Sequence, residues 1–410
     1  MTAPTRSQIL YITYDGLLDP LGASQIVPYL KGITAAQGSL VILSFEKPER
    51  GTTGMTRMAE ELAAFGIRWK SLRFTAGLGA PGKVWDLSRM YFWGARLAIQ
   101  NGAKIVHTRG HPTAQVGFFI KRLFGAKLIF DFRGLWVDER VDKGGWDLRR
   151  PLHRLQYRHF KNTERKLLAR ADQVVVLTHA VVDEVIKLGA SPPSKITVIP
   201  CCADFEYFPL ATAQRRAKAR ESIGIPADAL VLGYLGSVGR MYMLDRYFRL
   251  FELGAAKRRD VHALVITQDV DALRKVLGNS LPGALHSRVH VKPATRDEAP
   301  EVIAAMDVLV SFIQPSYARM AASPTKLAEC FAEGIPAICN AGVGDVAEQI
   351  DQLGAGIILD PASDDDLSRA ADRLGEIRAM GGLRLRNEAQ QILGLEVAVA
   401  RYRSVYSKLG

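Results

Sequence analysis

The sequence predicts an α/β protein of two doubly wound domains, each a parallel sheet with helices on both faces. Three observations predict this fold class. Short apolar runs alternate with longer helical patterns along the chain, as they do in right-handed βαβ units. The alternation restarts in the second half, after a polar stretch. A length of 410 residues exceeds one typical domain and suits two.

The first domain is expected to span residues 1–205. Its strand candidates are residues 8–14, 39–45, 103–108, 126–132, 172–178 and 195–200. A glycine-containing loop follows the first of them, and we expect a helix to begin near Ser24. A basic helical segment covers residues 148–172. These elements predict a Rossmann-like domain, whose ligands bind at the carboxyl ends of the strands.

The second domain is expected to span residues 206–385. A polar helical segment at 209–229 opens it, and the strand candidates are residues 230–240, 261–267, 288–293, 306–312, 337–341 and 356–360. Residues 386–410 predict one or two amphipathic helices that pack back on the first domain. Two such domains leave a cleft between them, where we expect a ligand.

Composition excludes several classes of protein. Apolar residues make up 48% of the chain and charged residues 23%, which is typical of globular proteins. No apolar run approaches about 18 residues, so no spanning helix is predicted. Residues 1–16 lack the pattern of a secretion signal, which favours a cytoplasmic protein. The four cysteines have neither zinc nor disulfide spacing and are expected to be reduced thiols.

The formal net charge of +12 favours partners that carry phosphate. No zinc finger, RNP-like aromatic motif or DNA-reading helix appears, so nucleic acid is not expected as a partner.

The loop at residues 15–24 is a candidate anion site. Gly16 and Gly22 would let backbone amides approach a phosphate, and the following helix adds partial positive charge. The loop is not G-x-G-x-x-G, and no acidic residue follows about 20 positions later, which disfavours a dehydrogenase. A tight turn without a ligand remains the alternative.

Charged residues gather after two strands of the first domain, where they can bind hydroxyls or act as acid and base. They are Arg109, His111, Asp131, Arg133, Asp138 and Glu139. A structural ion-pair network is the alternative. The basic segment 148–172 is either a solvated face or a contact for anionic lipid headgroups.

In the second domain, a loop with Gly233, Gly236 and Gly239 carries Arg240 and Tyr242 at its tip. A guanidinium at this position could neutralise a diphosphate. A turn with a solvent-facing arginine is the alternative.

The segment "SPTKLAECFAEGIPAICN" at residues 323–340 is the most informative. We expect Ser323 to cap a helix, Pro324 to occupy its first position and the free amides there to suit a phosphate. Lys326 and Glu329 lie three apart, on one face. A glutamate on an apolar helix is costly to bury unless it meets hydroxyls, such as those of a ribose, or a cation. A surface ion pair between the two is the alternative.

These stretches resemble the family 4 glycosyltransferases, which have the GT-B fold of two Rossmann-like domains facing a central cleft. The resemblance rests on residues 323–340, on "VIPCCADFEYFP" and "AAMDVLVSF", and on "ARESIGIPADALVLGYLGSVG". "FDFRGLWVDER" and "YDGLLDPLGASQIVPYL" are similar to a subgroup that builds surface polysaccharides. The resemblance implies sugar transfer from a nucleoside diphosphate sugar with retained configuration, without a cofactor or an essential metal. The implied partners are the nucleotide sugar, a glycan or lipid-linked glycan acceptor, and the inner face of the membrane as a peripheral contact.

The resemblance also implies roles for residues. Glu329 matches the glutamate that holds the donor ribose, and the other donor-side residues are Gly22, Ser237, Arg240, Tyr242, Ser323, Pro324, Thr325 and Lys326. His111, Arg109 and Asp131 are expected to be catalytic, facing the sugar and the acceptor. Arg133, Asp138 and Glu139 are expected on the acceptor side.

The chain also departs from the family pattern. Ala321 stands where the family has another glutamate, and Ser237 stands where it has an arginine. Arg240 and Lys326 are expected to supply the missing charge. Two alternatives stay open: a catalytically inactive sugar- or nucleotide-binding partner, and a nucleotide-sugar epimerase or hydrolase of the same fold.

Overall fold

The computed structural model describes residues 8–37, 39–75 and 78–409. Residues 1–7, which carry part of the argument against a secretion signal, lie outside these ranges. The chain forms two compact units, Met1–Pro200 with Leu395–Gly410 and Cys201–Gly394. Both hold a parallel sheet with helices, which confirms the predicted fold class. The expected domain limits were 205 and 385; in the structure the chain changes unit after residues 200 and 394.

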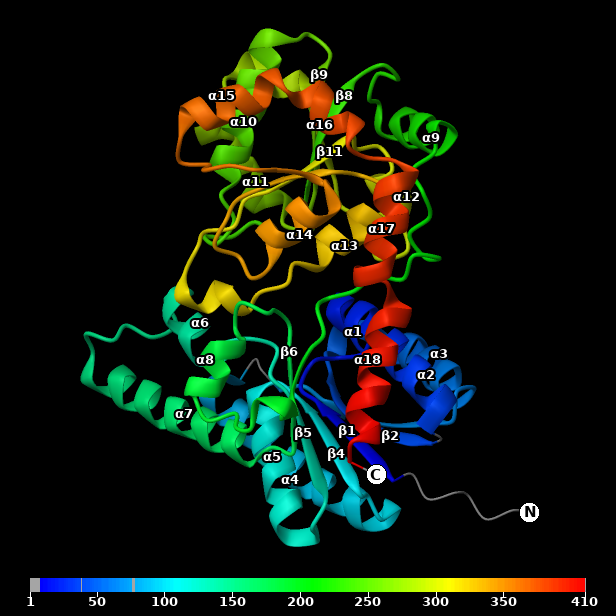
Figure 1. Ribbon diagram of the computed structural model, residues 1–410, viewed down its shortest axis with the longest axis vertical. Helices are drawn as coiled ribbons and strands as arrows, with labels where there is room; N and C mark the ends of the chain where they lie inside the picture. The colour runs from blue at the N-terminus through cyan, green and yellow to red at the C-terminus, as the bar shows by residue number, and fades with distance from the viewer. Residues whose placement is uncertain (1–7, 38, 76–77, 410) are drawn as a thin grey trace. The chain divides into compact units, whose positions relative to one another are not determined.

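Unit 1 contains a seven-stranded sheet in the order β3-β2-β1-β4-β5-β6-β7 (Figure 1). All its neighbouring strands pair in parallel. The order reverses direction between β1 and β4, and ligands bind at such a switch point in doubly wound sheets. The strands are β1 (Ile9–Thr13), β2 (Leu40–Glu46), β3 (Ile67–Arg73), β4 (Ile105–Arg109), β5 (Lys127–Asp131), β6 (Gln173–Val176) and β7 (Ile196–Val198).

The helices of unit 1 form two groups. In one, α2 packs against α1 and α18; in the other, α5 packs against α4 and α7. Right-handed crossovers put these groups on opposite faces of the sheet. The helices are α1 (Pro20–Gln25), α2 (Val27–Gln37), α3 (Gly51–Ala63), α4 (Gly79–Asn101), α5 (His111–Phe124), α6 (Trp136–Asp142), α7 (Pro151–Arg170), α8 (Val182–Lys187) and α18 (Leu395–Ser407).

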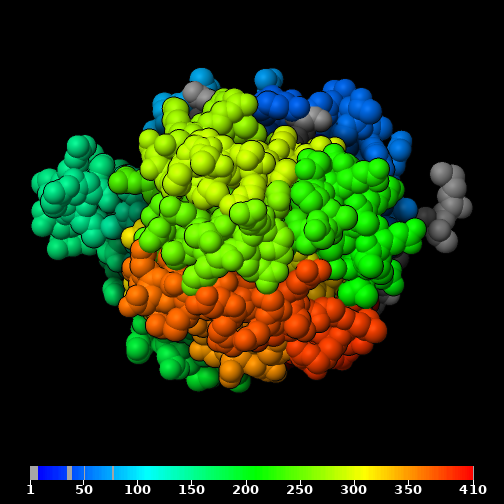
Figure 2. All heavy atoms as spheres, turned by 90° about the horizontal axis from the view of Figure 1, so that it is seen from above, coloured from blue at the N-terminus to red at the C-terminus, as the bar shows by residue number. Residues whose placement is uncertain are grey.

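Unit 2 contains a six-stranded parallel sheet in the order β10-β9-β8-β11-β12-β13, with its switch point between β8 and β11. Figure 2 looks onto the face where the yellow-green α10 lies beside the orange α15, and α11 packs against α10. The strands are β8 (Leu230–Leu235), β9 (Val261–Ile266), β10 (Val289–Lys292), β11 (Val308–Ser311), β12 (Ala337–Cys339) and β13 (Gly356–Ile358). The helices are α9 (Ala213–Ile223), α10 (Leu244–Lys257), α11 (Val270–Ser280), α12 (Ala299–Ile303), α13 (Thr325–Ala332), α14 (Val346–Leu353), α15 (Asp364–Asp372), α16 (Leu374–Ala379) and α17 (Leu383–Leu393).

The two C-terminal helices belong to different units. Helix α17 packs against α13 and α14 in unit 2, whereas α18 packs against α2 in unit 1. Within the described ranges, no helix is long and apolar enough to cross a membrane.

Strand β3 is an element that the sequence pattern did not predict. It pairs only with β2, at the edge of the sheet, and buries Ile67 and Leu72 while Arg68 and Arg73 are exposed. Edge strands carry charged side chains that keep other chains from pairing with them. Because these charged residues interrupt the apolar ones, the segment does not form an apolar run of the kind that predicts a strand.

The loop after β1 differs from its prediction. The first helix begins at Pro20, so Ser24 lies inside α1, where its hydroxyl donates to the carbonyl of Pro20. Gly22 is buried in the same helix, and a Cβ there would lie 2.0 Å from the carbonyl oxygen of Gly16. Gly22 therefore has a packing role, because only a residue without a side chain fits against this backbone.

Replacing Gly22 by alanine tests this packing. The new Cβ would also lie 2.6 Å from the Cα of Leu17, and backbone atoms cannot move aside. We expect the free energy of unfolding in urea to fall by about 1–3 kcal/mol or more. Gly278→Ala in α11 is the matched control, because no atom lies within 4 Å of its Cβ position. It should gain about 0.5–1 kcal/mol. Equal stability of Gly22→Ala and the wild type would contradict the packing role.

Candidate functional site

A groove of about 350 Å³ lies at the switch point of unit 2, at the carboxyl ends of β8 and β11. The loop after β8, the segment after β11 and the start of α13 form its walls. Its lining includes Gly236, Met241, Tyr242, Ile313, Arg319, Ser323, Pro324, Thr325, Lys326 and Glu329. A groove in this place is typical of the ligand sites of doubly wound sheets.

Lys326 is the most unusual side chain in this groove. Its ammonium lies 5.0 Å from the ring centre of Tyr234 and 4.8 Å from that of Tyr242. The Nζ atom is buried and has no hydrogen-bond partner among the described residues. Burial lowers the pKa of Lys326 to about 8. A buried ammonium without an acceptor is costly, and an incoming anion would remove that cost.

Glu329 lies one turn further along α13 and also lines the groove. Burial raises the pKa of its carboxyl group above the ordinary value. The ion pair with Lys326 that the sequence left as an alternative is not formed in the described part of the chain. The two side chains are therefore both available to a ligand.

The start of α13 differs from its prediction. The helix begins at Thr325, with Pro324 at the N-cap, so Pro324 does not occupy the first helical position. Ser323 does not cap the helix, because its hydroxyl accepts a hydrogen bond of 3.0 Å from the backbone amide of Cys201. No side chain caps the first amides of α13. These amides add partial positive charge at the wall of the groove.

The structure separates the predicted residues of the β8 loop. Tyr242 lines the groove and is fixed by a β-bridge to Ile313. Ser237 and Arg240 are exposed and lie outside the groove lining. Arg319, which the sequence did not single out, lines the groove instead. Its position after β11 could have indicated it, because that segment also follows a strand at the switch point.

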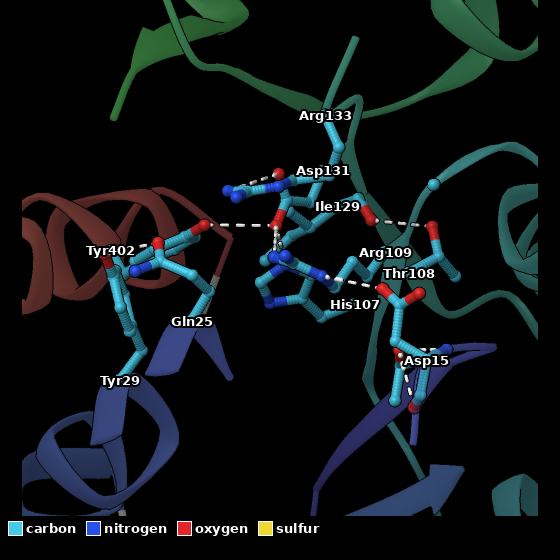
Figure 3. Close-up of polar contacts among 12 residues, drawn as sticks. Asp15, Gln25, Tyr29, His107, Thr108, Arg109, Ile129, Asp131, Arg133 and Tyr402 are labelled. Carbon is cyan, nitrogen blue, oxygen red and sulfur yellow. Dashed lines mark hydrogen bonds and ion pairs between the residues drawn. The ribbon is translucent and has the colours of Figure 1, made fainter. Parts of the chain in front are cut away.

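A second charged cluster lies at the switch point of unit 1, with Asp131 at its centre (Figure 3). Arg109 Nη1 lies 3.7 Å from Asp131 Oδ2, and Arg109 Nε donates to Asp15 Oδ2 at 3.2 Å. Arg133 Nη1 lies 3.9 Å from Asp131 Oδ1. Burial opposes ionisation, but Arg133, His107 and Arg109 together hold the pKa of Asp131 below its ordinary value.

The C-terminal helix α18 contributes to this cluster. Tyr402 donates to Asp131 Oδ2 at 3.1 Å, and the Tyr406 hydroxyl lies 2.6 Å from His107 Nδ1 (Figure 3 shows the first contact). Burial lowers the pKa of His107. Asp15 and Tyr402 were not among the predicted site residues. Asp15 was not singled out within the loop after β1, and nothing in the C-terminal tail indicates where its tyrosines lie.

His111 and Asp138 belong to a different, buried network. His111 Nε2 lies 2.8 Å from Glu164 Oε2, and its ring stacks on Trp136. Lys161 joins Glu164 to Asp138, with both ion pairs at 2.6 Å. Glu139 pairs with Lys143 one turn along α6. For these residues the contacts match the structural alternative, since they connect α5, α6 and α7.

Neither a metal-binding set of side chains nor a cysteine lines the groove or belongs to the Asp131 cluster in the described part of the chain. Within the described ranges, no three His, Cys, Asp or Glu side chains are grouped to hold a metal ion. The four cysteines are buried and form no disulfide with one another, and burial raises the pKa of Cys339 to about 12.

Two family models match the chain. Residues 33–202 match the Glycosyl transferase 4-like domain, and residues 215–390 match Glycosyl transferases group 1. Among curated proteins, the D-inositol 3-phosphate glycosyltransferase of Actinosynnema mirum is 28% identical over 134 residues, which are 33% of this chain and 30% of that protein. That of Kineococcus radiotolerans is 37% identical over 75 residues, 18% of this chain and 17% of that protein. The matches thus span about a third or less of these relatives.

Solved structures resemble nearly the whole chain. Sucrose-phosphate synthase from Thermosynechococcus elongatus has a TM-score of 0.71 at 15% identity, covering 98% of this chain and 99% of that one. HepE from Anabaena in complex with UDP-glucose has a TM-score of 0.66 at 16% identity, covering 98% of both chains. At these identities the likeness shows the fold alone.

The anchoring of Asp131 by Tyr402 can be tested with Tyr402→Phe. The variant leaves a buried carboxylate without its donor, so we expect a loss of about 1–3 kcal/mol of stability at pH 7. The lost bond favours the ionised carboxylate, so the folded-state pKa of Asp131 should rise. The difference in the free energy of unfolding between the variant and the wild type is then largest at pH 7. It shrinks as the pH falls and Asp131 becomes protonated.

Tyr406→Phe is the matched control, because it removes a buried hydroxyl from α18 without touching Asp131. Urea unfolding from pH 7 to below pH 3.8 measures both variants, because the pKa of Asp131 lies under its ordinary value of 3.8. The same pH dependence in both would contradict a specific role of Tyr402 toward Asp131.

Proposed function

The chain belongs to the family 4 glycosyltransferases with the GT-B fold, and we propose that it transfers a hexosyl group from a nucleoside diphosphate sugar with retained configuration. The observation that carries this proposal is the unpaired Lys326 ammonium beside Glu329 in the groove of unit 2. It supports an anionic ligand that also carries hydroxyl groups.

The donor is assigned to the groove by its chemistry. Lys326 and the uncapped amides of α13 would bind the diphosphate, and Arg319 adds positive charge to the same wall. Glu329 would accept hydrogen bonds from the vicinal hydroxyls of the ribose. Contact with the ribose hydroxyls would offset the cost of burying its charge.

The proposed reaction takes its stereochemistry from the family resemblance. The bond between the anomeric carbon and the diphosphate oxygen breaks, and a bond to the acceptor oxygen forms on the same face of the sugar. The acceptor proton passes to the leaving phosphate, so no protein nucleophile takes part. Lys326 would stabilise the charge that develops on the leaving diphosphate, without an essential metal. The anomeric proton signal of the product in NMR distinguishes retention from inversion.

The acceptor is the less constrained substrate. We propose a glycan, or a glycan on a lipid carrier at the inner face of the membrane, in surface polysaccharide synthesis. Arg109 and Asp131 in unit 1 offer a donor and an acceptor for its hydroxyls. The curated relatives are named for D-inositol 3-phosphate, so that compound belongs in the acceptor screen.

A second candidate function is a catalytically inactive nucleotide-binding partner. One observation favours it: Ala321, which stands where the family has a glutamate, is buried and supplies no carboxylate to the donor sugar. Such a protein would bind nucleotide and turn nothing over. An epimerase or hydrolase would release a sugar without any acceptor, which product analysis detects.

Glu329→Gln tests the ribose assignment. The variant keeps the shape but loses the charge, so we expect the Kd of the matching nucleoside diphosphate to rise about 10- to 100-fold. The 2′-deoxy form of the same nucleotide should bind the wild type more weakly, yet lose much less when Glu329 is replaced. Calorimetry measures the Kd of the ribose and 2′-deoxyribose nucleotides for both the wild type and the variant.

Glu348→Gln on the exposed face of α14 is the matched control and should bind like the wild type. Equal losses of affinity for the ribose and 2′-deoxyribose forms would sink the assignment of Glu329 to the 2′-hydroxyl.

A further inference from the structure

Helix α4 carries apolar side chains on the face that points away from the core. Met90 and Ala98 are buried, whereas Trp85, Phe92 and Ile99 are 58%, 61% and 63% exposed. These three recur every seven residues, so they lie on one side of the helix, opposite the buried side. A surface helix normally has charged or polar residues there. A helix that is apolar on both sides indicates that something covers its outer side.

The neighbouring helix extends this apolar surface. Helix α5 packs against α4 (Figure 1), and Phe119, Leu123 and Phe124 are exposed on it. The ring of Tyr91 contacts that of Phe119 with centres 5.2 Å apart. A shallow, mainly apolar groove of about 580 Å³ runs over this contact. We name the surface made of Trp85, Phe92, Ile99, Phe119, Leu123 and Phe124 the α4–α5 face.

Basic residues outnumber acidic ones around this face. The two helices contain five basic residues, Lys83, Arg89, Arg96, Lys121 and Arg122, and one acidic residue, Asp86. Asp86 is buried and pairs with Arg89, and Lys121 pairs with Asp172, so these two basic residues are already neutralised. Arg96 and Arg122 are exposed and make no ion pair within the described ranges. An apolar surface with unpaired cations beside it suits an anionic, apolar partner.

We propose that the α4–α5 face is the docking surface for an anionic lipid bilayer. Tryptophan and phenylalanine side chains partition to the boundary between headgroups and acyl chains, and arginines beside them attract anionic headgroups. A second copy of the chain fits less well. A symmetric interface would set the same basic residues against one another in a protein whose net charge is already +12.

This assignment deepens the proposed function, because a lipid-linked acceptor would be met at such a surface. It also moves the expected membrane contact. The sequence pointed to the basic segment 148–172, which exposes Leu152 and Leu155 but no large aromatic side chain, whereas α4 and α5 expose a tryptophan and three phenylalanines. Charge-reversal variants on the α4–α5 face and on α7 can show which of the two surfaces binds the membrane.

The test is vesicle flotation of the full chain at low salt. Vesicles contain phosphatidylcholine, either alone or with 30% phosphatidylglycerol. We expect the wild type to float with the anionic vesicles only. Trp85→Ser with Phe92→Ser should lower the partition coefficient at least about tenfold, because burial of each side chain contributes roughly that factor. Arg96→Glu with Arg122→Glu should also release the protein, and Arg154→Glu with Arg158→Glu on α7 should release less.

Leu383→Ser is the matched control, because Leu383 is an equally exposed apolar residue on α17 of unit 2. It should float like the wild type. All altered side chains are exposed, so thermal unfolding midpoints should stay unchanged and show that each variant is folded. Nucleotide binding by Trp85→Ser with Phe92→Ser should also stay unchanged, which keeps this test separate from the proposed transfer activity.

Three results would overturn the proposal. The first is a wild type that stays unbound with anionic vesicles. The second is a double serine variant that floats as well as the wild type. The third is a wild-type dimer in light scattering that the double serine variant converts to a monomer. That outcome would assign the face to a second copy of the chain.

Discussion

The site in unit 2 depends on one arrangement, an ammonium group held against two tyrosine rings with no hydrogen-bond acceptor among the residues that the structure describes. Each ring contributes about 0.5–2 kcal/mol to holding the cation, which offsets only part of the cost of burying it. The rings are themselves fixed. Tyr234 donates to the carbonyl of Ser237 at 2.7 Å, and Tyr242 is bridged to Ile313. The fold thus keeps Lys326 in place and leaves its charge unsatisfied, which is the arrangement that a diphosphate group would complete.

In unit 1, by contrast, the charged side chains of the cluster pair with one another. Asp131 lies between two arginines and accepts a hydrogen bond from the Tyr402 hydroxyl, so nearby cations compensate its charge, although its Oδ1 has no hydrogen-bond partner among the described residues. This balance holds the carboxylate ionised and oriented at the carboxyl edge of the sheet. The last helix of the chain is part of that arrangement, since α18 supplies both Tyr402 and Tyr406. A carboxylate whose charge is compensated by arginines can orient acceptor hydroxyls, whereas the Lys326 ammonium, which has no hydrogen-bond partner among the described residues, is suited to bind an anion.

Local patterns in the sequence predicted the parts of the molecule that depend on local chemistry. Alternating apolar runs predicted both sheets apart from the charged edge strand β3. Two charged side chains on an apolar helix indicated Lys326 and Glu329. Contacts between distant segments could not be predicted. Tyr402 lies 271 residues from Asp131 in the chain, and nothing in the tail marks its partner. His111 follows Arg109 closely in sequence, yet as the first residue of α5 it contacts Glu164 of α7.

The measurement that tests the central claim most directly is calorimetry of UDP, GDP, ADP, CDP and dTDP, with magnesium or EDTA, on the wild type and Lys326→Met. The account predicts that one nucleotide binds without metal. Its affinity should weaken as the pH rises from 7 to 9.5, because the ammonium loses its proton near the pKa of about 8. Lys326→Met should remove that pH dependence and raise the unfolding midpoint of the free protein, since a buried unpaired charge is gone. Binding that needs magnesium, or that is the same in the variant at every pH, would contradict the claim.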